Sequence, residues 1–498
     1  MTGTHRRGAR ELLALLLDEG SFESWDTRPV DVRPGPAYAA ELAAARERTG
    51  LDESIVTGAG LVRGRRVAVL ACEFGFLAGS IGVATAERLV RALERATAEE
   101  LPVIAAPTSG GTRMQEGTVA FLQMVKITAA VAAHRRAGLP YLVYLRHPTT
   151  GGVFASWGSL GHVTVAEPGA LVGFLGPRVF EALYGEPFPA GVQTAENLYA
   201  CGLLDAVLPP EELPAATARA LDILMTPRGE HPVPPPLPSE EVPDLPAWES
   251  ITRSRRPERP GVRALLKVAA DSVIPLNGTG QGEAAPGLLL ALARFGTQGC
   301  VVLGQERRSL AGRPLDPAAL RTARRGMRLA AELGLPLVTV IDTQGAALSR
   351  EAEEGGLAGE IARSLYDLVT LDAPTLCLLM GQGSGGGALA LLPTDRVVCA
   401  EHGWLSPLPP EGASAILYRT VDRAPEVAAA QRVRARDLLA DGIVDRIVAE
   451  HPDAADEPGP FLHRLGAAVE HELAALLAAD PGRRIATRLA RYRRLGLP

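Results

Sequence analysis

Residues 101–116 read LPVIAAPTSGGTRMQE, and the chain repeats this pattern as LPLVTVIDTQGA at residues 335–346. In both copies a proline-led apolar strand ends at small residues and glycine. Each copy is followed by a second apolar strand and a second glycine turn, PTTGGVFA at 148–155 and GQGSGGGALA at 381–390. A strand that stops at such a turn and restarts as a helix leaves backbone N–H groups without acceptors. Because these groups stabilise developing negative charge, the repetition predicts one site that handles two anions.

Length and composition indicate two α/β domains. The chain has 498 residues, more than a single hydrophobic core normally organises. Apolar residues make up 47% and aromatic residues only 4%, which suits buried parallel strands covered by helices. Alternating strands and helices predict β-α-β units with right-handed crossovers. Strands are expected at 67–72, 141–145, 300–303, 337–341 and 375–380, and helices at 81–100, 114–137, 321–333 and 351–369.

A proline-rich segment separates the two halves. The sequence HPVPPPLP at 231–238 opens a charged stretch without apolar periodicity. Prolines remove hydrogen-bond donors and hold the chain extended. We therefore predict an N-terminal domain at 1–228, a semi-rigid linker at 229–262 and a C-terminal domain at 263–498.

Charge and cysteine usage narrow the class of protein. The net charge of −6 argues against broad nucleic-acid binding. Two basic runs, RSRRPER at 253–259 and the tail from Arg483 to Arg494, are interpreted as solvated faces, with anion or partner docking as the alternative. Five scattered cysteines predict neither a disulfide framework nor a zinc site. The apolar run 12–17 is too short for a membrane segment, so we expect a soluble cytoplasmic protein with no membrane partner.

Ordered motifs in both halves resemble the carboxyltransferase subunits of bacterial acetyl-CoA carboxylase. The motifs similar to the β subunit are LDESIVTG (51–58), EFGFLAGSIG (73–82), SGGTRMQE (109–116), GLPY (138–141), PTTGGVFAS (148–156), AEPGALVGF (166–174) and GPRV (176–179). The motifs similar to the α subunit are IDT (341–343), GA (345–346), AEE (352–354), EIAR (360–363), the glycine run 381–387, SP (406–407) and EG (411–412). Together they indicate a fusion of a β-like and an α-like half.

The resemblance implies two crotonase-like β-β-α superhelix domains in tandem. It also implies transfer of a carboxyl group from carboxybiotin on a carrier protein to acetyl-CoA, giving malonyl-CoA, or to a related acyl-CoA. In that chemistry negative charge develops on the biotin urea oxygen and on the thioester carbonyl oxygen, and the leaving biotin takes the proton. Backbone N–H groups stabilise such charge without a side-chain base.

The resemblance assigns a role to each glycine turn. The amides of Gly110 and Gly111 would hold the acyl-CoA carbonyl, and those of Gly387 and Ala388 the biotin urea oxygen. The matching turns expected to shape the pocket contain Gly151, Gly152, Gly345 and Ala346. Arg113 and Arg178 would either bind CoA phosphate or fix the loops, while His147 and His162 are interpreted as structural.

Missing parts imply partners. The four-cysteine zinc ribbon of β subunits is absent, so no metal is predicted. There is no ATP-binding region, and Lys126 and Lys267 lack a Met-Lys-Met biotinylation motif. A separate biotin carboxylase and biotin carboxyl carrier protein are therefore expected. The family places its site between domains of different protomers, which implies a homo-oligomer.

The second half departs from the α-subunit pattern. Gln344, the segment 347–350 and the order Ser384-Gly385 differ from it, in the half expected to handle biotin. Two alternatives therefore remain open. One is a biotin-independent crotonase-like decarboxylase or hydrolase, and the other is a non-catalytic scaffold subunit.

Overall fold

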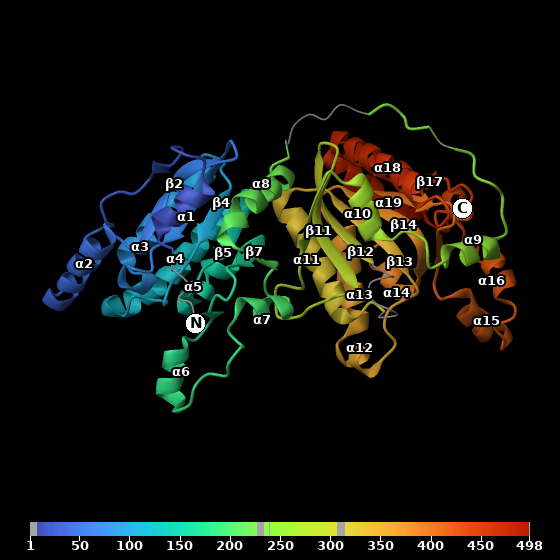
Figure 1. The fold of residues 1–498 in the computed structure, drawn as a ribbon. Coiled ribbons are helices and arrows are strands. Elements are labelled where there is room, and N and C mark those ends of the chain that lie inside the picture. The colour runs from blue at the N-terminus through green and yellow to red at the C-terminus, as the bar shows by residue number, and fades with distance from the viewer. Residues whose placement is uncertain (1–6, 227–233, 239, 306–313, 498) are drawn as a thin grey trace. The chain divides into compact units, whose positions relative to one another are not determined.

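The computed structural model describes residues 7–226, 234–238, 240–305 and 314–497, and it divides the chain into two compact units, Met1–Leu221 and Asp222–Pro498. Each unit contains its own β-sheet, with helices packed against it (Figure 1). Each unit also buries its own cluster of mainly Ala, Val and Leu side chains. The predicted domain boundary at 228 lies outside the described residues.

The sheet of the first unit has seven strands in the order β1-β2-β3-β4-β5-β7-β9. The strands are β1 (Glu23–Ser24), β2 (Ile55–Val62), β3 (Arg65–Cys72), β4 (Val103–Ala106), β5 (Tyr141–Leu145), β7 (Val163–Ala166) and β9 (Ala206–Val207). β2 and β3 form an antiparallel hairpin, and every pair from β3 to β9 is parallel. A separate small sheet pairs β6 (Thr149–Thr150) with β8 (Val172–Gly173) in parallel.

Helices connect these parallel strands, as parallel pairing requires. The connecting helices are α3 (Val83–Ala98), α4 (Gly117–Arg136), α5 (Gly151–Phe154), α6 (Pro177–Tyr184) and α7 (Ala195–Ala200); α1 (Ala9–Leu16) and α2 (Pro36–Thr49) precede β2, and α8 (Leu213–Leu224) follows β9. α3 follows the helical apolar period, and its Leu89 and Leu93 are buried in the core of this unit. It also packs against α4.

The sheet of the second unit repeats this plan in the order β10-β11-β12-β13-β14-β15-β17. Its strands are β10 (Ser272–Leu276), β11 (Leu288–Phe295), β12 (Gln298–Gln305), β13 (Leu337–Thr343), β14 (Thr375–Ser384), β15 (Arg396–Ala400) and β17 (Arg446–Val448). β11 and β12 form the antiparallel hairpin, and the pairs from β12 to β17 are parallel. The end of β14 also pairs with β16 (Trp404–Ser406), as β6 pairs with β8 in the first unit.

The helices of the second unit are α9 (Ala247–Ser254), α10 (Val262–Ala269), α11 (Pro317–Leu333), α12 (Arg350–Glu354), α13 (Leu357–Val369), α14 (Gly385–Leu389), α15 (Pro410–Tyr418), α16 (Ala424–Ala430), α17 (Ala435–Ala440), α18 (Pro458–Ala478) and α19 (Pro481–Arg494). The two α/β units with parallel strands match the predicted fold class.

The predicted linker differs from the structure. Within its range, residues 247–254 form α9, whose Ala247 and Ile251 are buried against Trp404 and Val433. This short helix buries one apolar face. Composition did not predict it, because the prolines of the preceding segment dominate the composition of the range. The last part of the expected linker is therefore packed on the second unit.

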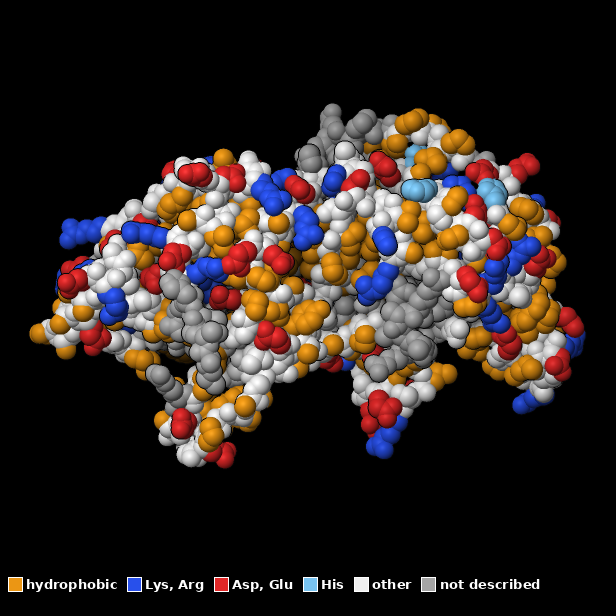
Figure 2. All heavy atoms as spheres, viewed as in Figure 1, with side chains coloured by type: hydrophobic (Ala, Val, Ile, Leu, Met, Phe, Trp, Pro, Cys, Tyr) orange, Lys and Arg blue, Asp and Glu red, His pale blue; other side chains and the backbone are white. Residues whose placement is uncertain are grey.

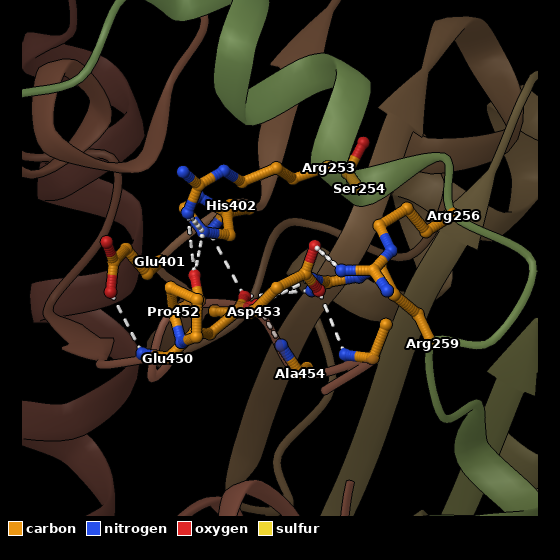
Figure 3. Close-up of polar contacts among 12 residues, drawn as sticks. Arg253, Ser254, Arg256, Arg259, Glu401, His402, Glu450, Pro452, Asp453 and Ala454 are labelled. Atoms are coloured by element: carbon orange, nitrogen blue, oxygen red, sulfur yellow. Dashed lines mark hydrogen bonds and ion pairs between the residues drawn. The ribbon is translucent and has the colours of Figure 1, made fainter. Parts of the chain in front are cut away.

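The basic run 253–259 is buried or paired rather than a solvated face (Figure 3). Arg259 is 3% exposed and binds both carboxylate oxygens of Glu450, at 2.5 and 2.8 Å, and Oδ1 of Asp453 at 2.8 Å. Burial alone would lower the pKa of Arg259, but the hydrogen bonds with Glu450 and the negative charges of Glu450, Asp453 and Asp342 together raise the pKa above its usual value. Arg253 donates to the carbonyl of Pro452 at 2.8 Å. The run therefore fastens the segment after α9 to the loop after β17.

The basic tail is also partly internal, which corrects the solvated interpretation. Arg484 and Arg488 of α19 are buried, and both bind Asp395, at 2.9 and 2.7 Å. Arg488 also donates to the carbonyl of Leu371 at 2.8 Å. These contacts attach the last helix to the end of the sheet.

Apolar side chains lie on the surface among interspersed acidic and basic groups (Figure 2). On α4, Val119, Phe121, Leu122 and Val125 are each more than half exposed. Among the described residues, Met114–Arg136 is the one helix whose length and composition would allow it to cross a membrane. Exposed apolar faces of this kind mark candidate interaction sites.

Candidate active site at the two glycine turns

The first glycine turn of unit 1 follows β4 and is held by internal hydrogen bonds. The amide of Gly110 donates to the carbonyl of Ala78 at 2.9 Å. The amide of Gly111 donates to Oγ of Ser109 at 2.9 Å, with Gly111 at φ 112°, where a side chain would be strained. The two amides that the sequence predicts for the acyl-CoA carbonyl are therefore already paired within the protein.

The next residue of this turn presents a different amide. Thr112 pairs with Ile81 in a parallel bridge. The amide of Ile81 donates to the carbonyl of Gly111, and that of Arg113 to the carbonyl of Ile81, at 3.0 and 2.9 Å. In such a bridge the N–H of the central residue points away from the paired strand. Within the described residues no group accepts from the Thr112 amide.

The second glycine turn of unit 1 lies against the first. A Cβ on Gly151 would lie 3.2 Å from Cα of Gly111, so the two turns touch through their backbones. Gly151 has φ 64°, and its amide donates to the carbonyl of Phe174 at 2.8 Å. Gly152 is the second residue of α5, where a helix has no acceptor for its N–H. No other group of the described chain accepts from the Gly152 amide.

Unit 2 repeats this arrangement. The amide of Gly345, at φ 135°, donates to Oγ1 of Thr343 at 3.1 Å, as Gly111 does to Ser109. Ala346 pairs with Leu315 as Thr112 pairs with Ile81. The structure brings Gly387 to Ala346, because a Cβ on Gly387 would lie 3.4 Å from the Ala346 nitrogen.

The strand registers define which residues correspond in the two units. Thr149 and Thr150 pair with Val172 and Gly173, as Gly383 and Ser384 pair with Leu405 and Ser406. Gly151 therefore corresponds to Gly385, Gly152 to Gly386 and Val153 to Gly387. α14 begins at Gly385, so Ala388 is the first residue whose amide the helix itself can pair. The first-turn amides of Gly386 and Gly387 precede it.

Arg113 anchors the first turn from inside the protein. Its guanidinium is fully buried and binds the Glu53 carboxylate at 2.5 and 3.0 Å, and it donates to the carbonyl of Ser80 at 2.8 Å. Burial would lower the pKa of Arg113, but the contact with Glu53 raises it well above its usual value. Of the two roles predicted for Arg113, this geometry matches the fixing of the loop and leaves no donor for a CoA phosphate.

The remaining side chains that the sequence singled out are Arg178, His147 and His162. Arg178 belongs to α6, and its side chain is outside the described part of the structure. Nδ1 of His147 accepts from the amide of Leu171 at 3.0 Å, and Nδ1 of His162 from that of Tyr141 at 3.0 Å. Both histidines therefore support neighbouring backbone.

No three His, Cys, Asp or Glu side chains converge as metal ligands within the described ranges. All five cysteines are free thiols. The absence of a resident metal stays a prediction.

The family model for the carboxyl transferase domain matches residues 4–483 of this chain. The chain belongs to the carboxyl transferase family. A probable biotin-dependent acyl-coenzyme A carboxylase beta3 subunit of Mycobacterium bovis is 63% identical over 98% of both chains. The acetyl-coenzyme A carboxylase carboxyl transferase subunits beta/alpha of Salinispora arenicola are 37% identical, over 99% of this chain and 92% of that protein.

Solved carboxyl transferases share the fold. The transcarboxylase 12S structure, described as a hexamer assembly with methylmalonyl-coenzyme A bound, has a TM-score of 0.72 at 21% identity and covers 93% of this chain and 90% of its own. A single-chain, multi-domain long-chain acyl-CoA carboxylase has a TM-score of 0.73 at 20% identity and covers 93% of this chain and 46% of its own. The predicted crotonase-like fold and the resemblance to carboxyltransferases are confirmed.

Sequence reasoning for this carboxyl transferase did not single out the amides of Thr112 and Gly152, which have no acceptor within the described residues. Both lie within motifs that the sequence singles out, but Gly152 was expected only to shape the pocket. The internal repeat holds the signal for both: 101–112 aligns with 335–346, which matches Thr112 to Ala346, and 150–153 aligns with 384–387, which matches Gly152 to Gly386.

Proposed function

We propose that this carboxyl transferase moves a carboxyl group from carboxybiotin on a carrier protein to the α-carbon of an acyl-CoA. The observation that carries the proposal is the paired glycine turn in each unit, with backbone amides that have no acceptor within the described chain. Two such pairs match the two oxygens on which charge develops. The 63% identity to a probable biotin-dependent acyl-CoA carboxylase subunit supports the donor and acceptor classes.

In unit 1 the amides of Thr112 and Gly152 would hold the thioester carbonyl. They belong to turns in backbone contact, since a Cβ on Gly151 would approach Cα of Gly111 to 3.2 Å. The resemblance predicts Gly110 and Gly111 as the donors. Their amides instead bind Ala78 and Ser109, and these hydrogen bonds hold the turn in place. Removal of each such donor typically slows a reaction about 10²- to 10³-fold.

In unit 2 the amides of Ala346 and Gly387 would hold the urea oxygen of biotin. Ala346 corresponds to Thr112 by its bridge to Leu315. Gly387 is expected from the sequence; it follows Gly386, the register counterpart of Gly152, and is chosen because it is the glycine next to the Ala346 nitrogen. A side chain on Gly387 would meet the Ala346 nitrogen at 3.4 Å, so the glycine keeps this space open. The turn thus fits a small planar oxygen acceptor, although residues around 344 and 384 depart from the α-subunit pattern.

The acyl group of the substrate is proposed from the resemblance and from the two relatives. Acetyl-CoA, giving malonyl-CoA, is the substrate expected from the resemblance. The more similar relative, at 63% identity, is named for acyl-coenzyme A in general, whereas the acetyl-coenzyme A carboxylase relative is 37% identical. We therefore propose an acyl-CoA carboxyltransferase in which acetyl-CoA is one candidate beside longer acyl-CoAs. A separate biotin carboxylase and carrier would complete the reaction.

The reverse reaction tests this function. Purified protein is incubated with malonyl-CoA, methylmalonyl-CoA or longer carboxylated acyl-CoAs, with and without biocytin, and loss of each thioester is followed. Biocytin-dependent loss is the expected result, and the fastest thioester names the acyl group. Thioester loss that is equally fast with and without biocytin would identify a decarboxylase or hydrolase. No loss with any thioester would favour a scaffold subunit.

A further inference from the structure

We propose that Gln305 is a positioning residue for the biotin side of the reaction. It ties together the two backbone segments that supply the amides of Ala346 and Gly387. The inference rests on the proposed function, because it concerns how the second pair of donors is held. Neither the repeat of glycine turns nor the family match points to this side chain.

Gln305 is the last residue of β12 and is 3% exposed. Its Nε2 donates to the carbonyl of Gly387 at 2.8 Å, and its Oε1 accepts from the amide of Asp342 at 3.2 Å. A carbonyl only accepts and a peptide N–H only donates, so these partners fix which end of the side chain faces each segment. Asp342 lies at the end of β13, three residues before Gly345. One amide side chain thereby connects the end of β13 to the first turn of α14.

The Gly387 carbonyl has a particular need for this donor. In α14 the amide of Ala390 donates to the carbonyl of Gly386 at 3.0 Å, and that of Leu391 to the carbonyl of Ala388 at 3.1 Å. Neither of these hydrogen bonds uses the carbonyl of Gly387. Residues 385–387 are three consecutive glycines, whose backbone is freer than that of any other residue. Gln305 holds the last of them in place.

Unit 1 lacks an equivalent side chain. Gly304 pairs with Val340 as Ala71 pairs with Ala106, so the residue that corresponds to Gln305 is Cys72. Cys72 is a buried thiol whose pKa burial raises to about 12. The carbonyl of Val153, the counterpart of Gly387, instead accepts from the amide and Oγ of Ser156 in its own turn, at 3.3 and 3.4 Å, and this donor does not reach the end of β4. The link that Gln305 makes between the end of β13 and the first turn of α14 is thus found in the unit assigned to biotin.

Gln305→Glu tests the role because it keeps size and shape but replaces the donor. The ionised carboxylate can still accept from the Asp342 amide, but it repels the Gly387 carbonyl. In the reverse assay we expect kcat/KM for biocytin to fall about 10- to 100-fold near pH 8, with KM for the acyl-CoA within about twofold of wild type. As pH falls, the protonated carboxyl can donate again, so the ratio of variant to wild-type activity should rise.

Thr339→Val is the matched control. Thr339 Oγ1 donates to the carbonyl of Leu391 at 2.7 Å, so this variant also deletes one buried hydrogen bond from the sheet to the segment after α14. It should lower the melting temperature while both KM values stay near wild type. Gln305→Met, which has no donor at any pH, should show the biocytin defect without recovery at low pH, and it replaces Gln305→Glu if that protein does not fold.

The outcomes separate the two hypotheses. Wild-type activity that depends on biocytin, with Gln305→Glu and Gln305→Met equal to wild type, would overturn the inference alone. So would equal losses for both substrates with a pH-independent ratio, because that is the signature of a structural defect. Wild-type protein without biocytin-dependent transfer would overturn the proposed function and the inference with it.

Discussion

Residues of the two touching turns of unit 1 differ in what their amides bind. Gly110 and Gly111 donate to Ala78 and Ser109, whereas the amides of Thr112 and Gly152 are directed elsewhere. The difference arises from segments distant in sequence, because Ala78 belongs to the loop after β3 and Gly152 to the turn after β6. A sequence motif can therefore locate a candidate oxyanion-binding turn. Which of its amides can bind a ligand depends on which amides already have an acceptor in the fold.

Gly152→Pro tests the assignment in unit 1. Proline is accommodated in the first turn of a helix, and it replaces the N–H group with a ring carbon that cannot donate. We expect kcat of the reverse reaction to fall about 100-fold or more, with acyl-CoA binding largely retained. Gly152→Ala keeps the N–H, and its Cβ would meet Met124 Cγ at 3.2 Å, near the end of a flexible side chain. Equal activity of the proline and alanine variants would remove Gly152 from the site.

His134 provides a stability prediction with a defined pH window. It is fully buried, and burial lowers its pKa to about 4. Because the unfolded value is about 6.5, the folded protein binds the proton less readily. Stability is complete above about pH 6.5 and falls as pH drops towards 4, by roughly 3 kcal/mol.

Urea unfolding at pH 7.5, 6 and 5 measures this effect. The stability of wild type relative to His134→Gln should decrease steadily as pH falls. His463→Gln removes an exposed histidine and serves as the control, for which no such trend is expected. Parallel pH curves for wild type and His134→Gln would contradict the assignment.

Among the elements, the buried strands and long helices were predictable and the exceptions have physical causes. The expected strands 67–72 and 141–145 correspond to β3 and β5, because runs of Val, Leu and Ala suit central strands. The expected helix 351–369 is instead two helices, α12 and α13, because Gly356 has φ 79° and interrupts it. The glycine motifs located the candidate site, but Glu53 and Gln305 could not be found, since each contacts its partner only through the tertiary fold.

The anchoring of α9 makes a testable contrast between two arginines of one run. Arg259→Leu would leave Glu450 buried without its cation and would take the nearer of two cations from Asp453, so unfolding should become easier by about 3 to 5 kcal/mol. Arg256 is 37% exposed and binds Asp456 at the surface, with a longer contact of 3.2 Å to Asp453, which keeps Arg259 as its nearer partner, so Arg256→Ala should cost much less than Arg259→Leu. Chemical denaturation of both variants measures the difference. Equal losses would show that burial does not distinguish the two ion pairs.

For the chain as a whole, duplication is the main organising fact. Two units with the same strand order each provide one pair of glycine turns, and the repeat was visible in the sequence before either sheet was known. The exposed apolar face of α4 was not predicted, because helical spacing alone does not say which apolar residues remain outside the core. We expect this face to contact a second copy of the chain, as the family resemblance implies a homo-oligomer.

Self-association through α4 is therefore expected. Sedimentation velocity should give a mass above the single-chain value of 52.3 kDa. Val125→Glu places a charge on a side chain that is 68% exposed within the apolar face, and it should shift the mass towards one chain. Glu94→Lys changes charge on the exposed side of α3 and should leave the mass unchanged. A single-chain mass for the wild type would contradict this expectation.

Transfer of label from an acyl-CoA to biocytin examines both turns in one experiment. Malonyl-CoA, or the carboxylated acyl-CoA consumed fastest, is prepared with ¹³C in its free carboxyl group and incubated with the protein and biocytin. The proposed function predicts one labelled carboxybiocytin for each thioester consumed, detected by NMR at alkaline pH. Thioester loss that releases labelled CO₂ without carboxybiocytin would contradict it and would assign the protein to decarboxylation.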